Sequence, residues 1–336
     1  MVLPVRNGGE YLQDAVDSIL QQTHTRLELI IVDDHSDDGA VQSLHKLDDR
    51  VRLVESKGHG VVNAFNAGLA CCEGDFVARM DADDLSLPQR FEAQLAYFEQ
   101  NPGVDIVSCC VEFFSAQAVQ GGLKRYQKWL NSVRSPQQIH RQLFIESPMP
   151  NPGAIFRKPA LELLGGYRQL AWPEDYDLYL RADAGQMKMG KPDAVLLRWR
   201  DHQRRLTHND EVYSREQFMR AKAYYLVKHR LPEMWLSAPP DTGELAPVIW
   251  GAGPTGCQMH DLLVELGCQP CGFIEVHPRR IGKHKRGLPV WSIDKAAEAD
   301  CPIVLVAVGA AGARRKIADF MAQHDKTEGQ DFLFVA

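Results

Sequence analysis

The sequence lacks a hydrophobic run long enough to cross a membrane. Its longest stretch without charged or strongly polar side chains, residues 301–313, has thirteen residues, whereas a membrane helix needs about 20. The chain also lacks a segment that reads as a signal peptide, because Met1 leads directly into a strand-like run. We therefore expect a cytoplasmic protein without stable membrane insertion.

A disulfide framework, low-complexity segments and a strong net charge are absent as well. Two pairs of the eight cysteines are sequence neighbours, a spacing that does not suit a disulfide framework, and one CxxC pair lacks the second pair of a zinc ribbon. With 26 glycines, 19 prolines and a net charge of −6, the composition excludes fibrous, disordered and strongly basic chains. A length of 336 residues predicts two domains.

The first 230 residues alternate short apolar runs with helical patterns, which is typical of an α/β fold. A linker is predicted at 231–247, where prolines interrupt the pattern, and a second α/β domain at 248–336. The expected strands of the first domain are 1–5, 27–32, 51–55, 75–80 and 104–114, with helices at 9–22, 61–72 and 88–100.

Acidic residues follow two of these predicted strands. The first cluster is Asp33 and Asp34, and the second is Asp81, Asp83 and Asp84. Parallel sheets bind ligands at the carboxyl ends of their strands. A Mg²⁺ or Mn²⁺ ion with a nucleotide diphosphate would relieve the repulsion between such carboxylates. The alternative is that these residues only form turns and cap helices; the two clusters together favour a binding site.

Seven motifs, taken in order, resemble those of the family 2 glycosyltransferases. They are PVRNGGEYLQDAVDSILQQT, ELIIVDDHSDDG, GVVNAFNAGL, MDADD, NPGAIFRKPALELLGGYR, PEDYDLYLR and LRWRDHQRRLTH, and they cover residues 1–230. The resemblance implies a GT-A fold, with a nucleotide-sugar-binding mixed sheet flanked by helices. It also implies an inverting, metal-dependent transfer of a hexose from a UDP-sugar to an acceptor hydroxyl.

The resemblance implies roles for individual residues in donor binding. Asp34, with Asp33 beside it, matches the carboxylate that accepts a hydrogen bond from uracil. Asp81 and Asp83 match the family's DxD pair, in which the first faces ribose and metal and the second ligates the metal. The implied nucleotide-sugar-binding residues are Pro4, Arg6, Asn7, Asp33, Asp34, Asn63, Asp81 and Arg200.

Asp175, preceded by Glu174, matches the family's general base, which takes a proton from the acceptor hydroxyl. The alternative for this acidic pair is an N-cap of the following helix. His202 resembles a position at which relatives offer a histidine to the metal, although a surface-loop histidine is the alternative. The implied ligands of Mn²⁺ or Mg²⁺ are Asp81, Asp83 and His202, whereas Asp84 is interpreted as a helix cap.

Two departures from the family pattern stand out. Phe65 occupies a position where many relatives carry an arginine, so Lys57 or His59 would have to replace that diphosphate contact. The first strand is either short or begins upstream of Met1.

The second domain opens with a glycine-rich loop. Gly251, Gly253 and Gly256 form GxGxxG after a strand, and Glu275 follows about 20 positions on, which is typical of a Rossmann-like domain. A basic stretch, 277–286, comes next. Three alternatives stay open: a nucleotide or NAD(P) site, an RNA-binding surface, and a structural module that dimerises the chain. No hydride-transfer constellation is visible, so a dehydrogenase is the least favoured interpretation.

The whole chain, including YQKWLNSV, GAGPTG and EGQDFLFVA, is similar to an animal N-acetylglucosaminyltransferase-like family that is associated with galactosylation of queuosine in tRNA. This resemblance implies UDP-galactose as donor and tRNA as acceptor. The basic stretch favours a tRNA acceptor, whereas the net charge of −6 gives it no support. The alternatives are a cell-surface or lipid-linked glycan as acceptor, and a protein that binds a sugar nucleotide or dinucleotide without catalysis.

Overall fold

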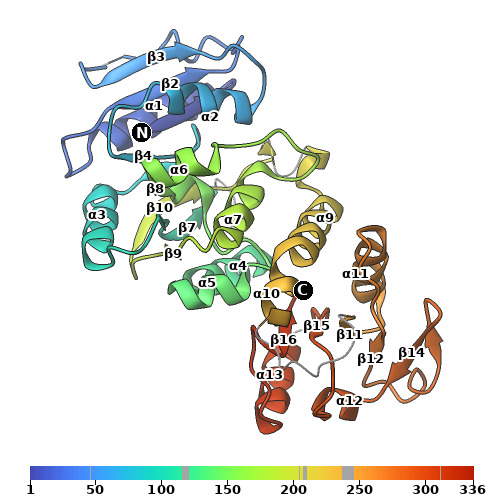
Figure 1. Ribbon diagram of the computed structural model, residues 1–336. Helices are drawn as coiled ribbons and strands as arrows, with labels where there is room; N and C mark the ends of the chain where they lie inside the picture. The colour runs from blue at the N-terminus through green and yellow to red at the C-terminus, as the bar shows by residue number, and fades with distance from the viewer. Residues whose placement is uncertain (46, 116–120, 204, 207–209, 237–245, 311) are drawn as a thin grey trace. The chain divides into compact units, whose positions relative to one another are not determined.

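The computed structural model describes the chain apart from residues 46, 116–120, 204, 207–209, 237–245 and 311 (Figure 1). The chain divides into two compact units. Unit 1 comprises Met1–His140 and Pro148–Tyr213, and unit 2 comprises Arg141–Ser147 and Ser214–Ala336. Both units combine helices with sheets, which confirms the α/β class. Over the described residues, no helix is both long enough and apolar enough to span a membrane.

Unit 1 begins with a parallel sheet in the order β1-β2-β3, visible at the blue end of Figure 1. Its strands are β1 (Val2–Val5), β2 (Leu29–Asp33) and β3 (Val51–Glu55). The helices η1 (Gly9–Tyr11) and α1 (Leu12–Leu20) connect β1 to β2, and α2 (Val61–Ala70) follows β3. Because all three strands run in the same direction, their carboxyl ends lie at one edge of the sheet.

Two further sheets complete unit 1. One has the order β4-β8-β6-β9, and the other has the order β5-β10-β7. A parallel bridge between Val2 and Arg79 places the segment after β4 next to β1. The strands are β4 (Phe76–Ala78), β5 (Leu85–Ser86), β6 (Ile106–Val107), β7 (Cys110–Phe114), β8 (Ile155–Arg157), β9 (Met189–Gly190) and β10 (Val195–Arg200). The helices are α3 (Arg90–Gln100), α4 (Gly121–Ser132), α5 (Pro136–Gln142), η2 (Asn151–Gly153), α6 (Lys158–Leu164), α7 (Glu174–Ala184) and η3 (Glu211–Tyr213).

The prediction of one long strand over 104–114 is wrong. The chain forms β6 and β7, which belong to different sheets. Between them the buried Ser108 hydroxyl donates to the Pro150 carbonyl at 2.7 Å, and the Ser108 amide donates to the Gly190 carbonyl at 3.0 Å. Ser108 is the one turn-favouring residue between the two strands, which is a weak signal in a mainly apolar run, so the change of sheet depends on contacts with distant segments.

Unit 2 contains a six-stranded sheet in the order β13-β14-β12-β11-β15-β16. Apart from β13, the strands are parallel. When these five strands are numbered along the chain, they lie side by side in the order 3-2-1-4-5, which is typical of a doubly wound Rossmann-like sheet. The strands are β11 (Val248–Trp250), β12 (Gly272–Ile274), β13 (His284–Lys285), β14 (Leu288–Trp291), β15 (Val304–Val306) and β16 (Phe332–Phe334). The helices are α9 (Arg215–Tyr225), the π-helical turn η4 (Leu226–Arg230), α10 (Leu231–Leu236), α11 (Pro254–Glu265), α12 (Asp294–Ala297) and α13 (Ala313–Gln323).

The predicted linker, 231–247, is helical at its start, because α10 occupies its first six residues. Residues 237–245 lie outside the described residues, so the linker and the domain boundaries drawn around it stay predictions.

The glycine loop of unit 2 depends on a close approach between β11 and α11. A Cβ added at Gly256 would lie 1.8 Å from the Gly251 carbonyl oxygen, whereas a Cβ at Gly253 would have no heavy atom within 4 Å. Position 256 therefore admits only glycine, whereas position 253 has room for a side chain.

We predict that Gly256→Ala destabilises unit 2 by about 3 kcal/mol, because the backbone must move to accept the methyl group. Gly253→Ala is the matched control in the same loop and should change the free energy of unfolding by less than about 1 kcal/mol. Chemical denaturation of the full chain followed by circular dichroism measures both. Equal stability of the two variants would contradict the close approach of Gly256 to the Gly251 carbonyl.

Candidate active site

Asp33 and Asp34 are held at the carboxyl end of β2. The Asp34 side chain is buried, and its two carboxylate oxygens accept hydrogen bonds from the Gly60 amide at 2.9 and 3.1 Å. Asp33 Oδ1 accepts from the Ser36 amide at 2.9 Å. The loop after β2 is therefore tied to the start of α2, with the Asp34 carboxylate at the junction.

The other residues predicted to bind the nucleotide surround this edge. Pro4 lies in β1 opposite Val32 of β2. Asn7 adopts a left-handed φ of 53°, and its Oδ1 accepts from the Asp37 amide at 2.9 Å, which joins the loops after β1 and β2. Arg6 is exposed, and within the described chain its guanidinium has no recorded partner. Asn63, on α2, is exposed and donates to the His59 carbonyl at 2.7 Å.

Asp81, Asp83 and Asp84 form an acidic cluster in which one carboxylate oxygen from each residue lies within 4.8 Å of the other two. Asp84 is completely buried; its Oδ1 accepts from the Arg200 amide at 2.8 Å, and its Oδ2 has no hydrogen-bond partner among the described residues. Burial, followed by repulsion from Asp83 and Asp81, raises the pKa of Asp84 well above its ordinary value. A buried, unpartnered oxygen beside two further carboxylates fits a hard divalent cation.

The interpretation of Asp84 as a helix cap is wrong. The N-cap of α3 is Gln89, which lies five residues further along the chain. Asp84 instead fixes the acidic cluster to β10 through its bond with the Arg200 amide.

His202 and Arg200, at the end of β10, both contact the acidic cluster. His202 Nε2 lies 2.7 Å from Asp83 Oδ2. Arg200 Nε donates to the Asp83 carbonyl at 2.7 Å, and its guanidinium carbon lies 4.1 Å from the centre of the Tyr11 ring. A segment more than a hundred residues away in sequence thus holds the acidic loop in place.

Glu174 and Asp175 form the first turn of α7, and Pro173 is the N-cap of that helix. Glu174 is buried, and its Oε2 accepts a hydrogen bond from the Tyr213 hydroxyl at 2.8 Å. Burial, followed by repulsion from Asp175, raises the pKa of Glu174 to about 7. Burial also raises the pKa of Asp175 to about 6, although the Tyr176 amide and Arg79 oppose this rise. Such values suit a proton acceptor near neutral pH.

Arg79 is a residue that the sequence reasoning missed. It is 4% exposed, and Nη1 forms an ion pair with Asp81 Oδ1 at 2.5 Å. Burial by itself lowers the pKa of the Arg79 guanidinium. The negative charges around it, including those of Asp81, Glu174 and Asp175, raise this pKa by more than burial lowers it, so the guanidinium stays charged. Arg79 therefore links the acidic cluster electrostatically to the Glu174–Asp175 pair. The signal was a lone arginine in the apolar run FVARM directly before the DxD motif.

Phe65, where relatives carry an arginine, points into the interior. It is completely buried, and its ring centre lies 4.4 Å from that of Tyr167. Lys57 and His59, the suggested replacements, are both exposed.

The predicted site residues of unit 2 lie at its glycine loop. Gly251, Gly253 and Gly256 join β11 to α11, and Glu275 follows β12. The Glu275 carboxylate accepts from Arg280 Nη1 at 2.8 Å and from the Val276 amide at 2.9 Å. A cavity of about 450 Å³ borders the loop; its walls include Ala252, Gly253, Pro254, Cys257, Arg280, Lys283, His284, Lys285, Arg286 and Val290.

We predict that Glu174→Gln stabilises the protein by about 2 kcal/mol at pH 8. The raised pKa of Glu174 means that the folded state binds more protons than the unfolded chain, so the wild-type free energy of unfolding falls as pH rises from about 4.5 to about 7. Glutamine stays neutral and keeps an acceptor for Tyr213. Denaturation of the wild type and of Glu174→Gln between pH 5 and pH 8 measures the pH dependence of the free energy of unfolding, with Glu99→Gln, at an exposed position, as control. An unchanged pH dependence in Glu174→Gln would refute the raised pKa.

Comparisons with known proteins identify the family of the chain. Residues 1–165 match the family model "Glycosyl transferase family 2". The amylovoran biosynthesis glycosyltransferase AmsE of Erwinia amylovora is 33% identical over 195 residues, which cover 56% of this chain and 68% of that protein. The O-antigen biosynthesis glycosyltransferase WbnJ of Escherichia coli is 28% identical over 210 residues, which cover 60% of this chain and 79% of that protein.

A solved structure of S. aureus TarS 1-349 in complex with UDP-GlcNAc is similar in fold, with a TM-score of 0.55 and 17% sequence identity. The similarity covers 68% of this chain and 66% of that one. Unit 1 therefore has a GT-A-like glycosyltransferase fold. From its family match and its curated relatives, the chain belongs to glycosyl transferase family 2.

Proposed function

We propose that unit 1 transfers a hexose from a UDP-sugar to an acceptor hydroxyl, with inversion at the anomeric carbon. The observation that carries the proposal is the link, through Arg79, between the acidic cluster Asp81–Asp83–Asp84 and the Glu174–Asp175 pair. The first group can bind a cation and a diphosphate, and the second can accept a proton. The similar TarS structure is a complex with UDP-GlcNAc, which supports a UDP-sugar as donor.

In this proposal the carboxyl edge of the first sheet binds the nucleotide. Asp34, with Asp33, accepts the uracil N–H, and Pro4, Arg6 and Asn7 lie along the nucleoside. The exposed guanidinium of Arg6 is available to a phosphate oxygen. Asn63 extends this surface from α2. Asp81 faces the ribose.

Asp81, Asp83, Asp84 and His202 would hold Mn²⁺ or Mg²⁺. Asp84 joins the set that the resemblance implied, because its buried Oδ2 has no other partner within the described residues. Such an ion, when bound, neutralises charge on the departing diphosphate. Arg200, which the resemblance places at the donor, also positions the cluster, because its amide donates to Asp84 Oδ1 and its Nε donates to the Asp83 carbonyl.

Asp175 is the proposed general base. As the acceptor oxygen attacks the anomeric carbon, its proton moves to an Asp175 oxygen, and the bond from that carbon to the diphosphate breaks, so that UDP leaves with the electron pair. Asp175 suits this task better than Glu174, because it is partly exposed and Glu174 already accepts the Tyr213 hydroxyl. One attack on the face opposite the leaving group gives inversion.

For the substrates we propose galactose as the sugar and a tRNA nucleoside, queuosine, as the acceptor. The exposed basic side chains Arg279, Arg280, Lys283, Lys285 and Arg286 on unit 2 support a phosphate-rich acceptor. Unit 2 would then contribute to acceptor binding. A glycan is the second candidate, and the names of the AmsE and WbnJ relatives support it.

We predict that Asp83→Asn and Asp175→Asn each lower kcat at least 100-fold without unfolding the chain, because one loses a cation ligand and the other loses the base. The exposed Asp14→Asn is the control and should keep wild-type activity. Release of UDP measures turnover, with UDP-galactose and other UDP-hexoses as donors and with tRNA or a glycan as acceptor. Wild-type kcat in both variants would disprove the assigned roles.

The pH profile of the same assay tests the base separately. Asp175 must be ionised, and its pKa is about 6, so kcat of the wild type should fall about tenfold per pH unit below that value. A rate that stays constant down to pH 5 would remove Asp175 from the base role while leaving the cation site intact.

A further inference from the structure

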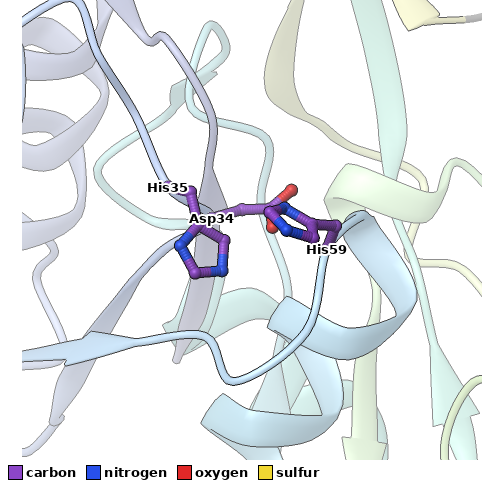
Figure 2. Close-up of side chains that lie close together, drawn as sticks. All are labelled: Asp34, His35 and His59. Atoms are coloured by element: carbon purple, nitrogen blue, oxygen red, sulfur yellow. The ribbon is translucent and has the colours of Figure 1, made fainter.

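Three side chains with metal-binding atoms converge beside the end of β2. Figure 2 shows Asp34 and His35, which follow one another in the loop after β2, together with His59, which lies in the loop before α2. One carboxylate oxygen and one ring nitrogen from each histidine all lie within 4.8 Å of one another. The sequence reasoning did not connect these residues, because 24 positions separate the two histidines.

The backbone holds this group in place. The Gly60 amide donates to both oxygens of Asp34, so the residue next to His59 is bonded to the carboxylate itself. His35 adopts a left-handed φ of 56°, a conformation that histidine, like asparagine and aspartate, adopts more often than most other residues with a side chain. The two imidazole rings lie against each other, with their centres 4.3 Å apart.

The ring nitrogens of both histidines are available to a ligand. Within the described residues neither ring has a recorded hydrogen-bond partner, and both side chains are exposed. Each Asp34 oxygen accepts one bond from Gly60 and retains a further lone pair. An ion could therefore bind all three residues without breaking an internal hydrogen bond, after small rotations of the exposed rings.

The donor set differs from that of the acidic cluster. Asp81, Asp83 and Asp84 offer only oxygen, which suits Mg²⁺ and Mn²⁺. Two imidazoles with one carboxylate suit a borderline ion such as Zn²⁺ or Co²⁺, which commonly takes three protein ligands and a water. We propose that Asp34, His35 and His59 form a second metal site in unit 1, selective for a transition-metal ion of this class.

The site has a consequence for donor binding that rests on the proposed function. Asp34 is the carboxylate proposed to accept the uracil N–H, so an ion bound to it would occupy the same lone pairs. Zn²⁺ and UDP should then exclude each other, and zinc should inhibit transfer in competition with the donor.

Titration of the full chain with Co²⁺ in excess Mg²⁺, without nucleotide, tests the site. We expect the visible absorption of one four-coordinate Co²⁺ per chain, displaced by Zn²⁺, and an affinity at least tenfold weaker in His35→Asn and in His59→Asn. Asparagine at position 35 tolerates the left-handed backbone. Asp83→Asn is the matched control and should bind Co²⁺ as the wild type does. No binding to the wild type, binding unaffected by the histidine variants, or loss only in Asp83→Asn would each overturn the proposal.

Calorimetric titration with UDP separates this inference from the proposed function. Where the metal site and the proposed donor site are both right, Zn²⁺ weakens UDP binding to the wild type at least tenfold and has little effect on His59→Asn. Histidine-dependent Co²⁺ binding together with unchanged UDP affinity would keep the metal site and refute the placement of uracil at Asp34.

Discussion

The site depends on the attraction between the buried guanidinium of Arg79 and the carboxylates around it. Glu174 is buried, Asp81 and Asp175 are partly buried, and burial raises the pKa of all three carboxyl groups, so without a compensating charge they would be driven towards the protonated form. Arg79 supplies the compensating charge, and Arg90 holds its backbone by donating to the Arg79 carbonyl at 2.8 Å. The same cation therefore stabilises ionised forms in both the proposed cation-binding cluster and the proposed base.

The geometry of the acidic loop depends on a second strand that the motif itself does not contain. β10 runs beside β5 and β7, and its last residue, Arg200, bonds to the loop through both backbone and side chain. His202 then contacts Asp83. The end of β10 and the residues after it thus position the carboxylates, which limits the reorganisation needed when a cation binds.

Local elements were largely predictable, because their signals lie within short windows. β3 has the predicted bounds, and the apolar run of β2 is buried throughout, as expected for a central parallel strand. The glycine loop between β11 and α11 was also predictable from the spacing of its glycines. The structure gives the reason for one of them, because only glycine fits the close approach at position 256. The error at 104–114 arose where a mainly apolar run passes from one sheet to another with only Ser108 as a turn signal.

The sequence by itself determined the α/β class, the order of the acidic motifs and their resemblance to family 2 glycosyltransferases, because these depend on local periodicity and on residues close together in the chain. Only the tertiary structure decided that Asp84 is buried without a partner for Oδ2 among the described residues, that Tyr213 donates to Glu174, and that His35 and His59 meet beside Asp34. Each of these depends on a contact between segments far apart in sequence. Burial and charge at such contacts follow from packing, which no local pattern encodes.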